Sequence, residues 1–167
     1  MLVAPKSNLI ANGDFEKGNV GEPPACWVSE NVLLTDSNLA FTGLQAASMG
    51  AGVVSDPAIM FQDIPVLPVR RFLLTFQMSS SDCVAGSLLV QVRWLSNSGC
   101  DLGAGLHVFI SGKSLGKPGE GMWLAQMHLT DYSPVGVCSA RLIFTRSPGK
   151  SGNSPTVIDA VAFAEVN

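Results

Sequence analysis

The stretch that decides the fold reads Arg71-Phe72-Leu73-Leu74-Thr75-Phe76-Gln77-Met78-Ser79. Alternate side chains of a β-strand point to opposite faces of a sheet. One face of this strand would carry the large apolar residues Phe72, Leu74, Phe76 and Met78. The other would carry Leu73, Thr75, Gln77 and Ser79. The alternation predicts a strand that buries one face in a core and leaves the other accessible.

Three further stretches alternate in the same way: Ser87–Leu95, Met122–Thr130 and Gly136–Thr145. We expect their core-facing residues to be Val90, Val92 and Trp94, then Trp123, Ala125, Met127 and Leu129, then Ala140, Leu142 and Phe144. The outward residues would be Gln91 and Arg93, then Gln126 and His128, then Ser139, Arg141 and Thr145. Several strands would thus each present one apolar and one polar face.

Short β-rich segments recur through the rest of the chain, separated by Gly, Pro, Asn and Ser turn signals. The remaining candidates are Asn8–Ala11, Trp27–Thr35, Leu44–Met49, Ala58–Ile64, Gly105–Ile110 and Thr156–Val166. We find no convincing helix, internal repeat or linker. The sequence therefore predicts an all-β fold over residues 1–167, a single two-sheet antiparallel β-sandwich of the jelly-roll type.

Composition excludes several classes of function. The 167 residues are enough for one core, and 14% are charged against about 25% in typical soluble domains. The net charge is −3 with Lys and Arg scattered singly, so we expect no nucleic-acid partner. No apolar run approaches the roughly 20 residues that span a bilayer, so we expect no membrane partner. The opening residues, Met1–Lys6, are too short and broken for a signal peptide.

The four cysteines are Cys26, Cys83, Cys100 and Cys138, and no two are spaced as Cys-x-x-Cys. A zinc site therefore has little support. One interpretation is buried free thiols that act as small apolar groups. A Cys83–Cys100 disulfide is the alternative, which geometry permits but the sequence alone does not indicate.

Several motifs carry a resemblance to a known family. They are Asn8-Leu9-Ile10-Ala11-Asn12-Gly13-Asp14-Phe15-Glu16, Trp27, Thr42–Ala47, Phe61–Val66, Arg71–Phe76, Trp123, Ser133–Gly136 and Val157–Val161. In this order they resemble the jelly-roll carbohydrate-binding modules across essentially the whole chain. The nearest likeness is the N-terminal domain that precedes collagen-like triple-helix repeats in spore-forming bacteria, although this chain has no Gly-x-y tract. The resemblance implies an extracellular, cell-surface or spore-surface location.

The resemblance also implies a structural Ca²⁺ that ties the N-terminal strand to the last strand. Carried over by motif, its ligands would be the Asp14 carbonyl, the Glu16 carboxylate, groups of Thr42 and Gln45, and Asp159. Ca²⁺ prefers six to eight oxygen ligands, so this set is chemically suitable. The alternative is that Asp14 makes a turn while Glu16 and Asp159 accept backbone N–H bonds.

A candidate ligand face comes from the outward polar residues Gln77, Gln91, Arg93, Gln126, His128 and Arg141. Long amides and guanidinium groups bond directionally to hydroxyls, carbonyls or carboxylates. If these residues share one sheet face, we expect it to bind a glycan, as the resemblance implies. The alternative is a structural or assembly domain of a bacterial surface or spore layer, in which this face contacts another copy of the chain in a homo-oligomer.

Catalysis has little support in the sequence. Only His107 and His128 could act as imidazole bases, and neither belongs to a nucleophile motif. A Gly-x-Ser-x-Gly elbow is absent, and most acidic residues fall in turns rather than as a facing pair. We therefore expect a binding or assembly domain and not an enzyme.

Overall fold

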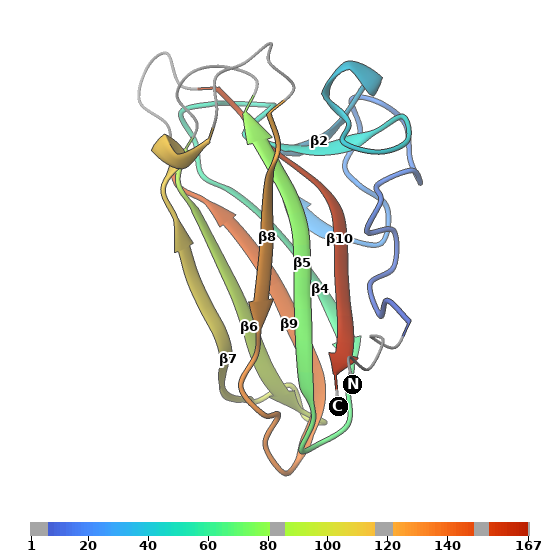
Figure 1. Cartoon of the computed structure of the whole chain (residues 1–167), viewed down its shortest axis with the longest axis vertical. Coiled ribbons are helices and arrows are strands. Elements are labelled where there is room, and N and C mark those ends of the chain that lie inside the picture. The colour runs from blue at the N-terminus through green and yellow to red at the C-terminus, as the bar shows by residue number, and fades with distance from the viewer. Residues whose placement is uncertain (1–6, 81–85, 116–121, 149–153, 167) are drawn as a thin grey trace.

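The computed structural model describes residues 7–80, 86–115, 122–148 and 154–166. Two five-stranded antiparallel sheets pack face to face (Figure 1). Sheet A consists, in spatial order, of β1 (Val28–Glu30), β4 (Ala58–Pro65), β9 (Val137–Arg146), β6 (Leu88–Ser96) and β7 (Asp101–Ile110). Sheet B consists of β2 (Val32–Thr35), β3 (Ala46–Met49), β10 (Thr156–Val166), β5 (Arg71–Ser80) and β8 (Leu124–Leu129).

The predicted fold class, an all-β antiparallel two-sheet sandwich, is therefore confirmed. In the described part of the chain the only helical elements are two 3₁₀ turns, η1 (Ser37–Leu39) and η2 (Gly112–Ser114). No helix among these residues has the length and apolar character needed to cross a bilayer.

The core lies between the sheets and contains most of the side chains that the alternation predicted. Phe72, Phe76, Trp94 and Phe144 are all at most 2% exposed. Phe72 stacks on Phe163 of β10 with ring centroids 4.9 Å apart, and Phe76 meets Phe144 edge-on across the two sheets at 5.2 Å. Aromatic pairs in these geometries stabilise a core beyond the area that they bury.

Strand β8 reverses its predicted faces. Ala125, Met127 and Leu129 are exposed, whereas Gln126 and His128 are half-buried. The register explains this, because Gln126 lies opposite Phe76 of β5, whose side chain points into the core. The prediction of an apolar inner face for this strand, with Gln126 and His128 outward, is wrong.

Trp123 precedes β8 and follows the same reversal. It is half-buried and meets the exposed ring of Phe41, with centroids 5.4 Å apart. The prediction that Trp123 lies in the core is therefore also wrong. An edge strand packs fully on neither face, so its hydrophobic pattern says little about which face is buried.

Two predicted strands differ in detail. The segment 27–35 is divided between the two sheets at Asn31, whose φ of 56° lies in the left-handed region. Residues 8–11 form no regular strand, but they lie along β10 (Figure 1). The Leu9 N–H donates to the Phe163 carbonyl at 2.8 Å, and the Phe163 N–H donates to the Asn8 side chain at 2.9 Å. The N-terminal segment thus bonds to the part of β10 beyond residues 156–158, where β3 no longer pairs with it.

The described cysteines Cys26, Cys100 and Cys138 are free and exposed, so the expectation of buried thiols is wrong for them. A free Cys100 also contradicts the disulfide to Cys83, which itself lies outside the described residues.

Candidate functional site

The six residues predicted to form one polar face lie on two different sheets. Gln91 and Arg93 are on β6 and Arg141 is on β9, all in sheet A. Gln77 is on β5, and Gln126 and His128 are on β8, all in sheet B. The outer faces of a sandwich point in opposite directions, so a single six-residue surface does not form.

The sheet A residues form a charged row across four neighbouring strands. The Arg141 guanidinium donates to both oxygens of Asp63 on β4, at 2.7 and 2.8 Å. Its carbon also lies over the Phe61 ring, 4.6 Å from the centroid. Arg93 donates through Nε and Nη2 to one oxygen of Asp101 on β7. These ion pairs are half exposed, so they fix side-chain positions more than they stabilise the fold.

A second row runs beside the first on the same face. The Gln91 amide nitrogen lies 3.2 Å from His107 Nδ1, and these two residues are directly opposite on β6 and β7. Phe109, two residues beyond His107, exposes 65% of its surface and lies opposite Leu89. The structure thus places an exposed aromatic ring beside the polar groups of sheet A.

Sequence reasoning missed Asp63, Asp101, His107 and Phe109 as members of this face. Alternation along 58–64 and 105–110 would have put Asp63, His107 and Phe109 on the outward side of their strands. Asp101 lies beyond the predicted limits of its strand, which starts earlier than expected.

On sheet B the remaining predicted residues do not form a polar surface. Gln77 is half-buried on the outer side of β5, opposite Ala125. His128 Nε2 lies 2.9 Å from the Gln126 side-chain oxygen, and its ring is 6.3 Å from that of Phe76. Burial at this position lowers the pKa of His128 below its ordinary value, because a charged imidazole would lose hydration.

Of the five residues predicted to bind a metal, Thr42 and Gln45 belong to the loop 41–45, and Glu16 and Asp159 bond to its backbone. Glu16 Oε1 accepts the N–H groups of Leu44 and Gln45 at 2.8 and 2.9 Å. Asp159 Oδ2 accepts those of Phe41 and Thr42 at 2.8 and 2.9 Å. Both carboxylates therefore hold the loop backbone, as the alternative interpretation of this motif expected.

Two observations at this loop are compatible with a cation. The side-chain oxygen of Gln45 is buried and accepts no hydrogen bond. Burial raises the pKa of Asp159, three backbone N–H bonds oppose that rise, and the nearby negative charge of Glu16 adds to it. The oxygen donors present, carboxylate and amide, are those that Ca²⁺ prefers. Among the described residues, however, no three His, Cys, Asp or Glu side chains gather as a metal cluster.

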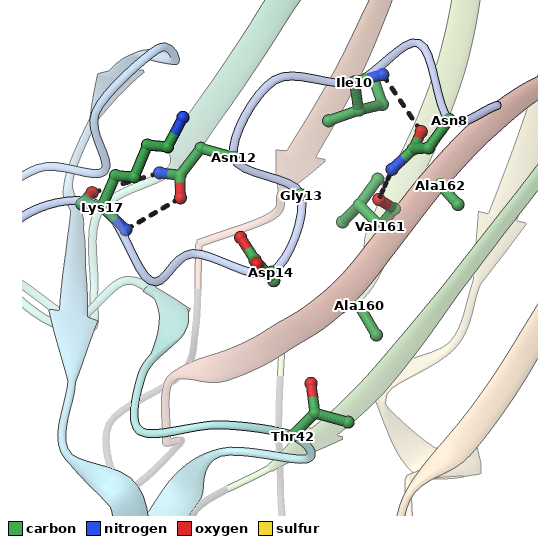
Figure 2. Close-up of a pocket in the computed structure, with 10 residues that line it drawn as sticks. All are labelled: Asn8, Ile10, Asn12, Gly13, Asp14, Lys17, Thr42, Ala160, Val161 and Ala162. Carbon is green, nitrogen blue, oxygen red and sulfur yellow. Dashed lines mark hydrogen bonds between the residues drawn. The ribbon is translucent and has the colours of Figure 1, made fainter.

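A pocket of about 380 Å³ lies between the N-terminal segment and β10, close to this loop (Figure 2). Asp14, Lys17 and Thr42 line it together with the backbone of β10 at a bulge between Asp159 and Ala162. Asn12 also lines it, but its side chain is fully engaged with the backbone of Lys17 and Ala25. Figure 2 shows the Asp14 carboxylate on the side of the N-terminal segment that faces Asn12 and Lys17, away from β10.

Comparisons with known proteins identify the fold. Neither a family model nor a curated protein matches the chain. Among solved structures, the enzymatically active domain of the bacteriophage CBA120 tailspike protein 4 has 17% identity and a TM-score of 0.73, over 95% of this chain and 21% of that chain. A family 61 carbohydrate-binding module in complex with β-1,4-galactotriose has 15% identity and a TM-score of 0.66, over 95% and 98% of the two chains.

A Stig cyclase from Fischerella sp. TAU also matches, with 14% identity and a TM-score of 0.69 over 98% of both chains. This chain thus spans about a fifth of the tailspike chain and nearly all of the other two. At these identities the likeness establishes a shared β-sandwich. Carbohydrate-binding modules are among the proteins that share it, and so are enzymatic domains.

Proposed function

We propose that this chain is a non-catalytic glycan-binding module and that the outer face of sheet A is its binding surface. The observation that carries the proposal is the exposed Phe109 ring beside the Gln91–His107 pair and the charged row of Arg93 and Arg141. Sugars offer apolar C–H faces and hydroxyl groups. An exposed ring suits the former, and amide, imidazole and guanidinium groups suit the latter.

The size of the face suits an oligosaccharide. Neighbouring strands lie about 4.8 Å apart, so the five strands of sheet A span roughly 19 Å from β1 to β7. Phe109 lies on the β7 edge and Phe61 is on β4, towards the other edge. A linear glycan that crosses the strands would meet the exposed Phe109 ring, the polar groups beside it and the Arg141 guanidinium that lies over the Phe61 ring.

Two further points support binding over catalysis. The acidic groups of the charged row are both engaged with arginines, so none stands ready as a general acid or base. The family 61 module that shares this fold was solved with a galactotriose bound, whereas the cyclase was solved with an indole derivative. The sugar precedent accords with the motif resemblance of the chain.

The test combines a glycan array with titration calorimetry on the best array ligand. Phe109→Ala should weaken binding at least tenfold, because stacking on the ring is lost, and Gln91→Ala should weaken it less. Val135→Ala is the matched control, since this apolar residue is 84% exposed in a loop outside both sheets. The proposal fails if the wild type binds no glycan, or if Phe109→Ala binds as tightly as Val135→Ala.

We also propose that the 41–45 loop binds a structural Ca²⁺. Its ligands are the carboxylates of Glu16 and Asp159, groups of Thr42 and Gln45, and the main-chain carbonyl of Asp14. The unbonded Gln45 oxygen and the two neighbouring carboxylates support this site. A cation that binds only the folded state stabilises it by mass action, so Ca²⁺ should raise the melting temperature and a chelator should reverse the rise.

The calcium test uses two matched variants. Glu16→Gln should abolish the response to Ca²⁺, because it removes a ligand charge. Asp14→Asn should keep it, since the proposed ligand at position 14 is the main-chain carbonyl. A wild type whose melting temperature ignores both Ca²⁺ and chelator would leave Glu16 and Asp159 as backbone acceptors alone.

A further inference from the structure

The four edge strands of the sandwich differ in how they are protected against pairing with other strands. An unprotected edge presents unpaired backbone N–H and C=O groups, and proteins usually shorten, interrupt or charge it. β1 has three residues and ends in Glu30, and β2 has four. β7 is interrupted by two register shifts against β6. These three edges are protected by length or irregularity.

β8 lacks all of these protections. It runs as Leu124-Ala125-Gln126-Met127-His128-Leu129, with no proline and no Asp, Glu, Lys or Arg. It pairs with β5 over six consecutive residues without a register shift. Within the described ranges, the backbone of β8 itself bonds to no strand but β5. Just beyond its C-terminal end the Asp131 N–H donates to the Gly105 carbonyl of β7 at 2.8 Å, so the outer edge is open along residues 124–129 only.

The side chains of β8 that point outward are the apolar ones, which the alternation of apolar and polar residues along this strand would place in the core. Met127 is 72% exposed and Leu129 is 44% exposed. Opposite them on β5 lie Thr75 and Leu73, so the neighbouring part of the outer face is uncharged as well. A local conflict between hydrophobic pattern and burial is expected where a surface has a function. An exposed apolar patch beside a free edge is typical of an interface.

We propose that β8 pairs antiparallel with β8 of a second copy of this chain, joining the two B sheets across a two-fold axis. Antiparallel pairing of one strand with itself is self-complementary, as an isologous dimer requires. The partner must offer an uncharged free edge, and β8 of another copy is such an edge. The chain carries a net charge of −3, so two copies approach with least repulsion along a strand that lacks charge.

The pairing also determines which side chains meet. Residues directly opposite in an antiparallel pair share a face, so the outward Met127 and Leu129 of one copy would lie against the same residues of the other. The half-buried Gln126 and His128 would remain on the inner side. Sheet A takes no part in this contact, so a dimer would carry two separate glycan faces.

The experiment measures molar mass by light scattering and sedimentation across a broad dilution series. We expect the wild type to be a dimer that dissociates on dilution. Met127→Lys should give a monomer with an unchanged β-sheet spectrum, because it places like charges at the symmetric contact. Val28→Lys is the matched control, since Val28 is 59% exposed on the edge strand β1 and should leave the dimer intact.

Amide hydrogen exchange locates the contact. The amides of residues 124–129 should gain protection at high protein concentration, and other edge strands should not. A wild type that is monomeric throughout, including one that recruits a different protein at β8, would overturn self-pairing. A dimer that survives Met127→Lys, or whose protection lies outside β8, would overturn it equally.

Discussion

Arg93 and Arg141 lie directly opposite each other on the neighbouring strands β6 and β9. Like charges in this position repel, because directly opposite side chains are only about 5 Å apart at Cβ. Each arginine is held from its far side by a carboxylate, Asp101 on β7 or Asp63 on β4. The result is a row of acid, base, base and acid across four strands. The two positive charges at its centre and the two negative charges at its ends give the row no net charge.

This arrangement predicts a measurable coupling. Arg93→Gln and Arg141→Gln should each lose one ion pair and relieve one repulsion, so each single variant should change stability little. The repulsion between Arg93 and Arg141 is a single interaction. The double variant relieves it once, whereas the sum of the two single variants counts that relief twice. It should therefore lose about 0.2–1 kcal/mol more than the sum of the singles. Urea unfolding of all four proteins measures this excess, which should shrink at high salt. Strict additivity at low salt would contradict it.

Gly105 gives a second prediction, because it lies under the indole ring of Trp94. A Cβ at position 105 would be 2.2 Å from a ring carbon, and Trp94 is only 2% exposed. Gly105→Ala should destabilise the fold by about 1–3 kcal/mol through overpacking. In a Trp94→Phe background the same change should cost less, since the smaller ring leaves room. Equal costs in both backgrounds would show that the backbone, not the indole, sets the penalty.

The sequence predicts the fold well where strands are central. β5, β6 and β9 each have neighbours on both sides, so one face is buried and the hydrophobic residues fall on it. β8 has a neighbour on one side only, and its polar Gln126 and His128 face inward at the rim of the core. Alternation correctly predicted a strand here but assigned the wrong face to the core, because the face that points inward depends on the register of β8 against β5.

The candidate sites were predictable to different degrees. The resemblance to carbohydrate-binding modules assigned Glu16 and Asp159 to one site, although they are 143 residues apart in the sequence. In the structure both carboxylates accept backbone N–H groups of the loop 41–45. The polar face was predicted from residue type alone. Nothing in residue type tells which sheet a strand joins, so Gln91, Arg93 and Arg141 fell on one sheet and the other three on the opposite sheet.

A third prediction concerns pH. Burial holds the pKa of His128 below its ordinary value of about 6.5 in the folded state. Between the two values the unfolded chain binds more protons, so stability should rise with pH through that window and level off above about 6.5. Urea unfolding from pH 5 to 8 measures the slope. His128→Gln should remove most of it, and His107→Gln, at an exposed position, should keep it. A slope that survives His128→Gln would assign it to another group.

The last prediction concerns Arg146, which is fully buried at the end of β9. Its Nη1 donates to the carbonyls of Val54 and Asp56 at 3.0 and 3.4 Å, and its Nη2 donates to that of Ser154 at 3.1 Å. Its Nε has no partner, and no carboxylate pairs with it among the described residues. Burial therefore lowers the pKa of this guanidinium.

Burying a cation without a counter-ion lowers the free energy of unfolding, because the charge loses its hydration. The hydrogen bonds from Arg146 to the three carbonyls must offset this loss. Arg146→Met keeps the length of the side chain but leaves those carbonyls without its donors. The penalty is about 1–3 kcal/mol for the buried Ser154 carbonyl and smaller for the part-buried carbonyls of Val54 and Asp56. We expect a loss of at least about 2 kcal/mol in urea unfolding. Arg71→Met is the matched control, because Arg71 is half-buried, donates from Nε to the Thr130 carbonyl and lies over the exposed Tyr132 ring. Its loss should cost under about 1 kcal/mol. If the two variants unfold at the same urea concentration, Arg146 does not hold these loops together.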